Sequence, residues 1–163
     1  ALPRARFRRP WSDMSFLNDS TANNDHESPS FRSCRYVSPL LDGLRILVLE
    51  DEFLIAMDVE QLCRDHGAAD VVIARDLIEI DRADLTTRFD VAIVDLMLSG
   101  ASTLEFAAEL RAARLPFVFA SGYSDSDEIK ASFPDTTLVP KPYSGKDLVE
   151  AVAEACGRRA TAG

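Results

Sequence analysis

Residues 89–95 read FDVAIVD, an almost unbroken apolar run that ends in an aspartate. A short run of this kind is typical of a strand that is buried on both faces of a sheet. An acid that closes such a strand would suit an Asx turn, but its place at the end of the most apolar run favours a functional role. Asp95 is therefore the first candidate functional residue.

Four further apolar runs alternate with helical patterns on either side of this segment. We expect strands at 45–49, 70–75, 115–120 and 136–139, and helices at 52–66, 76–85, 102–110, 126–132 and 144–153. The first helix should bury one face, made of Phe53, Ile55, Ala56, Val59, Leu62 and Cys63. Asp76, Ser102 and Ser144 are the expected caps of the second, third and last helices. Apolar strands alternating with helices predict an α/β fold, a doubly wound parallel sheet covered on both faces.

Polar side chains follow four of the five predicted strands. They are Glu50 and Asp51, Asp95, Ser121, and Lys141. Binding residues of parallel sheets gather at the carboxyl ends of the strands, so neighbouring strands would bring these groups into one pocket. Three carboxylates repel one another, and a hard divalent cation such as Mg²⁺ would neutralise them together with the lysine.

This set of residues suits phosphoryl transfer to a carboxylate, which needs positioning and charge neutralisation above all. Asp95 would be the phosphoacceptor, while Glu50 and Asp51 would hold Mg²⁺. The Ser121 hydroxyl and the Lys141 ammonium would contact the phosphoryl oxygens. Taken singly, Glu50 and Asp51 could be helix N-terminal acids, and Ser121 an ordinary loop hydroxyl.

Four motifs at these strand ends resemble those of response-regulator receiver domains. They are LVLEDE at 47–52, VAIVDLM at 91–97, FASGY at 119–123 and VPKP at 139–142. The resemblance covers residues 44 to about 158 and implies a flavodoxin-like (βα)5 sheet of strand order 2-1-3-4-5. It also implies Mg²⁺-dependent phosphorylation of Asp95, slow self-catalysed hydrolysis, a metal ligand in the Met97 backbone carbonyl, and a cis peptide between Lys141 and Pro142.

The chain departs from the common receiver pattern in three ways. The loop after Asp95 is short and lacks the usual proline, and Asp95 is a few residues closer to Ser121 than usual. Leu138 stands where most receivers place a switching aromatic. Together with FASGY, these features resemble the single-domain "FAT GUY" subgroup and predict signalling through the loop and short helix at 121–132.

The resemblance implies a stand-alone two-component response regulator. Its partners would be a histidine kinase or histidine phosphotransfer protein, docking on the first helix and the loops beside the site, and a downstream protein target. A homodimer is an open alternative to a monomer. A degenerate receiver that binds a partner without phosphorylation is the main competing hypothesis.

Two enzyme classes fit less well, and we expect a signalling domain rather than a turnover enzyme. A phosphohydrolase with an aspartyl-phosphate intermediate needs an acid two residues after the nucleophile, where this chain has Met97. A dinucleotide-binding domain needs a glycine-rich turn after the first strand, where this chain has Glu50-Asp51-Glu52.

Charge and composition separate an N-terminal segment from the patterned part. The chain has 163 residues and a net charge of −9, which argues against nucleic-acid and acidic-membrane partners. Residues 1–43 are rich in Ser, Asn, Asp and Pro, which predicts a flexible extension before a receiver domain at 44–160. The pattern contains no secretory signal, no membrane-spanning run and no disulfide framework among its three cysteines, so we expect a cytoplasmic protein.

Overall fold

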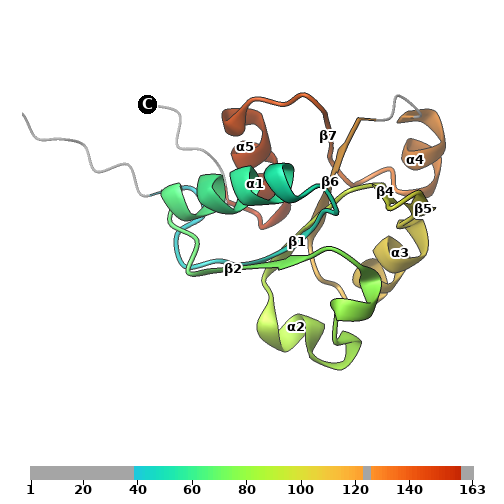
Figure 1. The fold of residues 1–163 in the computed structure, drawn as a ribbon, viewed down its shortest axis with the longest axis horizontal. Helices are drawn as coiled ribbons and strands as arrows, with labels where there is room; N and C mark the ends of the chain where they lie inside the picture. Colours follow the sequence, from blue (N-terminus) through green and yellow to red (C-terminus); the bar gives the residue numbers. More distant parts are fainter. Residues whose placement is uncertain (1–38, 123–125, 159–163) are drawn as a thin grey trace, which may run out of the picture. The chain divides into compact units, whose positions relative to one another are not determined.

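A five-stranded parallel sheet forms the centre of the molecule in the computed structural model, which describes residues 39–122 and 126–158 (Figure 1). Its strands are β1 (Arg45–Leu49), β2 (Asp70–Ala74), β3 (Val91–Val94), β6 (Phe117–Ser121) and β7 (Leu138–Pro140). They are ordered β2-β1-β3-β6-β7, and each neighbouring pair is parallel. Counted within this sheet, the order is 2-1-3-4-5, which confirms the predicted doubly wound, flavodoxin-like α/β fold.

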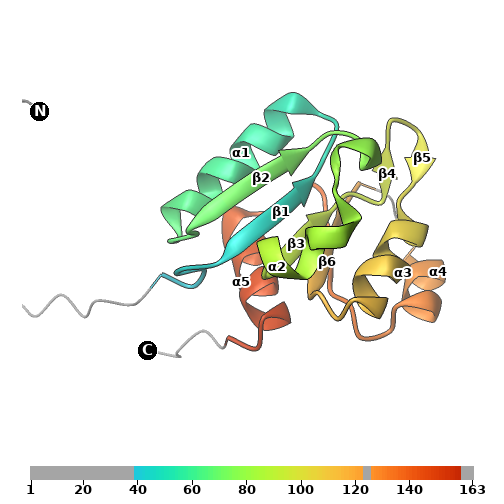
Figure 2. The same cartoon turned by 90° about the horizontal axis from the view of Figure 1, so that it is seen from below.

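Helices cover both faces of the sheet, which explains why its strands are apolar throughout. α1 (Phe53–Asp65) and α5 (Gly145–Ala155) lie on one face, where Ile46 and Val48 of β1 point (Figures 1 and 2). α2 (Leu85–Arg88), α3 (Leu104–Ala112) and α4 (Ser126–Ser132) lie on the other face, toward Leu47 and Leu49. Alternate strand residues thus enter two separate apolar cores.

The buried face of α1 is narrower than the helical spacing of its apolar residues predicts. Ala56, Val59 and Cys63 are buried, whereas Ile55 and Leu62 are only partly buried. Phe53 was expected on this face, but it is 58% exposed. The prediction is wrong for Phe53 because this residue opens the helix, at the end beside the strand termini, where less of the core lies beneath it.

The single helix predicted from residue 76 is also wrong. Two 3₁₀ turns, η1 (Leu77–Glu79) and η2 (Arg82–Asp84), precede the four-residue helix α2. Carboxylates of Asp76 and Asp81 accept hydrogen bonds from the amides two residues ahead, at 3.1 and 3.0 Å. Two successive aspartates that satisfy the local amides compete with a continuous helix.

A short hairpin follows β3 and was not predicted. β4 (Met97–Leu98) pairs antiparallel with β5 (Ala101–Ser102). The two turn residues, Ser99 and Gly100, both have positive φ, at 50° and 85°, as two-residue hairpins commonly require. The hairpin projects beside the carboxyl ends of the central strands (Figure 2).

Two helix caps test the sequence predictions for the N-termini of α3 and α5. The residue that precedes α3 is Thr103 rather than the predicted Ser102, although the Ser102 hydroxyl accepts a bond from the Leu104 amide at 3.3 Å. Ser144 caps α5 as predicted, accepting from the Asp147 amide at 3.2 Å.

The packed part of the chain extends a few residues before the predicted boundary at Leu44. Leu41 is fully buried, and its amide donates to the His66 carbonyl at 3.0 Å. Residues 1–38, with most of the predicted extension, lie outside the described residues. Among the helices that the structure describes, none is long and apolar enough to cross a membrane.

Candidate functional site

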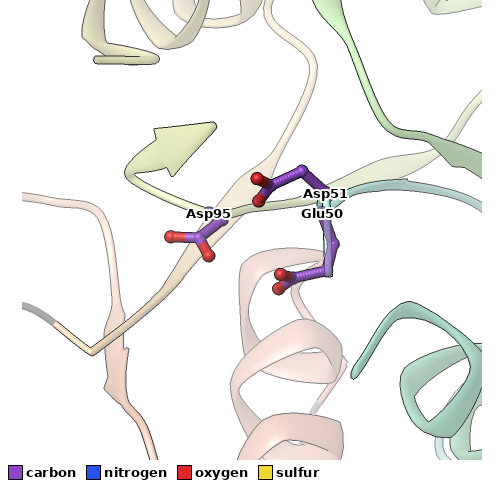
Figure 3. Close-up of side chains that lie close together, drawn as sticks. All are labelled: Glu50, Asp51 and Asp95. Atoms are coloured by element: carbon purple, nitrogen blue, oxygen red, sulfur yellow. The ribbon is translucent and has the colours of Figure 1, made fainter. Parts of the chain in front are cut away.

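Three carboxylates meet at the carboxyl ends of β1 and β3. Figure 3 shows Glu50, Asp51 and Asp95 gathered around a common space, and one oxygen of each lies within 4.8 Å of the others. The sheet register explains this, because Leu49 and Val94 are paired neighbours and the acids follow directly. A hexacoordinate Mg²⁺ with bonds of about 2.0–2.1 Å spans roughly 4 Å, so these residues fit a hard divalent cation with small adjustments.

A lysine that follows the edge strand β7 contacts two of these acids. Lys141, which follows β7, places its Nζ 2.6 Å from Glu50 Oε2 and 2.6 Å from Asp95 Oδ2. Its backbone amide donates to the Ser121 carbonyl at 2.7 Å, which fixes the loop against β6. With all four groups ionised, the cluster keeps a negative excess that a divalent cation would balance.

Burial governs the proton affinity of two members of the cluster. Burial raises the pKa of Glu50, although the hydrogen bond from Lys141 opposes this shift. Burial also disfavours the Lys141 ammonium, but hydrogen bonds to Asp95 and Glu50 outweigh it and raise the lysine pKa. Lys141 therefore stays protonated at neutral pH and holds the two carboxylates in place.

Asp95 is held at both its side chain and its backbone. Oδ1 accepts a bond from the Met97 amide at 3.2 Å, and Oδ2 accepts from Lys141. The Asp95 carbonyl accepts from the Thr103 hydroxyl at 2.6 Å, and Thr103 is fully buried. Sequence reasoning missed Thr103, because a threonine before a helix resembles an ordinary cap and nothing local indicates a contact eight residues back.

Asp51 has two further partners that no motif indicated. Its Oδ2 accepts from the Ser99 amide at 2.9 Å and from the Ser99 hydroxyl at 3.2 Å. Its backbone carbonyl accepts from the Arg75 guanidinium, with Nη2 at 3.1 Å. The only available signal was that Arg75 is the last residue of a predicted strand and that Ser99 lies in the loop after another.

The remaining predicted residues also lie at this edge of the sheet. Ser121 ends β6 and is 1% exposed, next to Pro140 of β7. The peptide between Lys141 and Pro142 is cis, as expected. Met97 opens β4, and the assignment of its carbonyl as a metal ligand stays a prediction.

A hollow of about 500 Å³ opens beside the lysine, between α1 and the loop after β7. It is lined by Glu52, Ile55, Asp58, Gly122, Lys141, Pro142 and Tyr143. Burial raises the pKa of Tyr143, so its phenol is neutral at physiological pH. The hollow gives the cluster an open approach from the α1 side.

Comparison with known proteins points to one kind of domain, although no family model matches the chain. Transcriptional regulatory protein PdtaR of Mycobacterium tuberculosis is 28% identical over 123 residues, 70% of this chain and 57% of PdtaR. The response regulator PhyR of Brucella abortus superposes with a TM-score of 0.58 at 26% identity, over 72% of this chain and 50% of PhyR. The chain thus spans about half the length of these relatives.

Shorter solved structures match over nearly their whole length. A response regulator receiver protein of Sinorhizobium medicae has a TM-score of 0.62 at 22% identity, over 72% of this chain and 97% of its own. A response regulator of Chloroflexus aurantiacus also has a TM-score of 0.62, at 21% identity, and is covered completely. The sheet order and these similarities show that the described part of this chain has the fold of response-regulator receiver domains.

Proposed function

We propose that this domain accepts a phosphoryl group on Asp95 from a histidine kinase or a histidine phosphotransfer protein and signals through protein–protein contacts. The observation that carries the proposal is the contact of Lys141 with both Asp95 and Glu50, beside Asp51. Glu50, Asp51, Asp95 and the Met97 carbonyl would hold Mg²⁺, which when bound would neutralise charge on the approaching phosphoryl group.

The transfer itself needs few groups from the protein. A carboxylate oxygen of Asp95 forms a bond to phosphorus while the P–N bond of the donor phosphohistidine breaks, and the imidazole nitrogen keeps that electron pair. Lys141 and the Ser121 hydroxyl would contact the transferred oxygens. A carboxylate nucleophile needs no general base for this step.

Release of the phosphoryl group should be slow, which suits a signalling domain better than a turnover enzyme. Two residues after Asp95 the chain has Met97, whose side chain cannot donate a proton to a leaving group. Hydrolysis of the aspartyl phosphate would then rely on water approaching without an acid or base at this position.

An apolar patch on α1 lies beside the site and suits a helical phosphoryl donor. Phe53, Leu54 and Met57 are 58%, 76% and 46% exposed, at spacings that share one side of the helix. Ile55 and Asp58 of the same helix line the hollow beside Lys141. A phosphotransfer helix presenting its histidine would find apolar contacts here and reach Asp95 nearby.

Aromatic packing offers a path for the signal in place of a switching aromatic at Leu138. Phe119 of β6 lies two residues before Ser121 and packs edge-on against Phe133, after α4, with ring centroids 5.5 Å apart. Phe117 contacts both rings. A shift of Ser121 toward a phosphoryl group would press on α4 through this cluster, and hydrogen exchange in 126–135 should change on phosphorylation. Unchanged exchange there would remove this path.

Incubation with acetyl phosphate tests the phosphoacceptor assignment. With Mg²⁺, intact mass should rise by one phosphoryl group in the wild type, and neither Asp95→Asn nor a metal-free sample should gain it. No gain in the wild type, with either acetyl phosphate or phosphoramidate, would favour the degenerate receiver that binds without phosphorylation.

Docking on α1 is tested separately, with a partner kinase. Leu54→Ala and Phe53→Ala should slow phosphotransfer from the kinase but leave phosphorylation by acetyl phosphate unchanged. Ile78→Ala is the matched control, because Ile78 is 87% exposed but lies on η1, away from this helix. Equal rates of phosphotransfer from the kinase to all three variants would show that the docking surface lies elsewhere.

A further inference from the structure

The carboxylate of Asp51 is held by a residue outside the four motifs of the site. Ser99 directs both its amide and its hydroxyl at one oxygen, Oδ2, at 2.9 and 3.2 Å. Within the described part of the chain, no hydrogen-bond donor contacts the other oxygen, Oδ1. The two carboxylate oxygens are therefore not equivalent.

The hairpin β4–β5 places these two donors. Ser99 has a φ of +50° and precedes Gly100, so the tip of the hairpin turns back toward the end of β1. In this left-handed conformation the amide and the side chain of one residue can point to the same acceptor, which forms a small anion-binding arrangement. Most L-residues avoid this region, so Ser99 holds a strained backbone conformation.

The backbone of Asp51 is held from the opposite side. The Arg75 guanidinium, at the end of β2, donates to the Asp51 carbonyl through Nη2 at 3.1 Å and Nε at 3.3 Å. Asp51 is only partly buried, and packing alone would leave its side chain several rotamers. Contacts to both its backbone and its Oδ2 restrict that choice, and one carboxylate oxygen of Asp51 lies within 4.8 Å of an oxygen of Glu50 and of Asp95.

We propose that Ser99 is a positioning residue for the metal site, which fixes Asp51 so that one oxygen is presented to the cation and the other is retained by the hairpin. This inference rests on the proposed function, because it takes Asp51 as a ligand of a divalent cation. Hydrogen bonds that orient a ligating carboxylate typically contribute about 10–100-fold to metal affinity. The Ser99 contact is solvent-exposed, so we expect an effect near the lower end, about 10-fold.

Binding of Mn²⁺ alone, followed by electron paramagnetic resonance of the free ion, measures this effect on the unphosphorylated full chain. Ser99→Ala removes the hydroxyl, and Ser99→Gly does so while relieving the positive φ. Both should weaken Mn²⁺ binding by about 10-fold relative to wild type. Ser102→Ala, the same change on the other strand of the hairpin, should bind as wild type does.

The outcomes separate this inference from the proposed function. If wild-type protein binds no Mn²⁺, or if Asp51→Asn binds equally well, the metal site itself is wrong. If wild type binds and the Ser99 variants bind with unchanged affinity, only the positioning role is overturned. Tighter binding by the Ser99 variants would also overturn it, because Ser99 would then compete with the cation for Asp51.

Discussion

Replacing Lys141 with methionine tests the electrostatic balance of the site, because Lys141 is the cation that joins Glu50 and Asp95. The Glu50 side chain is 4% exposed and the Asp95 side chain 11%, so neither regains much water when the ammonium is lost. Removing one partner of a buried ion pair costs about 3–5 kcal/mol. Protonation of Glu50 sets an upper limit to this cost, since burial already raises its pKa.

The limit can be worked out from proton linkage. Keeping a glutamate with its ordinary pKa of 4.5 neutral at pH 7 costs about 3.5 kcal/mol, because each pH unit is worth about 1.4 kcal/mol. At pH 5.5 the same cost falls to about 1.5 kcal/mol. Since the folded pKa of Glu50 is raised, and rises further without Lys141, acidification favours the folded variant. We therefore expect Lys141→Met to lose about 2–3 kcal/mol at pH 7 and less than about 1.5 kcal/mol at pH 5.5.

Urea unfolding followed by far-UV circular dichroism measures these free energies. The single tryptophan, Trp11, lies outside the described residues, so the backbone signal is followed instead. Lys146→Met is the matched control, because Lys146 is 79% exposed and its pair with Glu150 is 3.7 Å long. It should change stability by less than about 0.5 kcal/mol. A Lys141→Met penalty equal to the control, or one that does not shrink at pH 5.5, would refute the reasoning.

Three further outcomes follow from the packing. Gly67 has a φ of +93°, and a Cβ there would lie 2.8 Å from Pro39 Cβ and 3.1 Å from Asp42 Cα, so Gly67→Ala should cost about 2–3 kcal/mol. Gly100→Ala, with φ +85° and open space around it, should cost only about 1 kcal/mol, and equal losses in urea unfolding would contradict the packing of residues 39–43. Thr103→Val should cost about 1–2 kcal/mol of stability because the Asp95 carbonyl loses its hydrogen-bond donor. Thr87→Val, at an exposed hydroxyl, should cost less than about 0.5 kcal/mol. Similar thermal unfolding of the two variants would argue against a stabilising bond between Thr103 and Asp95. Burial raises the pKa of Cys63 to about 12, so iodoacetamide at pH 8 should leave this thiol unmodified in the folded protein and label it in urea. Peptide mass spectrometry measures both. Fast labelling of the folded protein would mean that α1 opens readily.

The sheet and most of the site could be predicted because both depend on local sequence signals. Short apolar runs mark strands that are buried on both faces, and parallel strands place their following residues at one edge. With the strands taken as neighbours, that rule predicted that Glu50, Asp51, Asp95 and Lys141 lie together, although they are far apart in the chain. The five strands of the parallel sheet agreed with the structure, and so did their order, which the resemblance had implied.

The parts that were not predicted depend on contacts between distant residues or on competition within a loop. Ser99 reaches Asp51 only because a two-residue turn folds the loop after β3 back on the site. The helix predicted from Asp76 is an example of competition within a loop. Hydrogen bonds from nearby amides to the side chains of Asp76 and Asp81 outweigh the helical spacing of the apolar residues. Phe53 follows the helical period but stands at the helix end, so period alone overstated its burial.

Chemical mapping of the phosphorylated residue tests the central claim most directly. Borohydride converts an aspartyl phosphate to homoserine, and peptide mass spectrometry then locates it in protein treated with acetyl phosphate and Mg²⁺. We predict homoserine at position 95 and at no other aspartate. Homoserine at another position, or none in protein that retains its fold, would contradict the account of this strand end as a phosphoacceptor site.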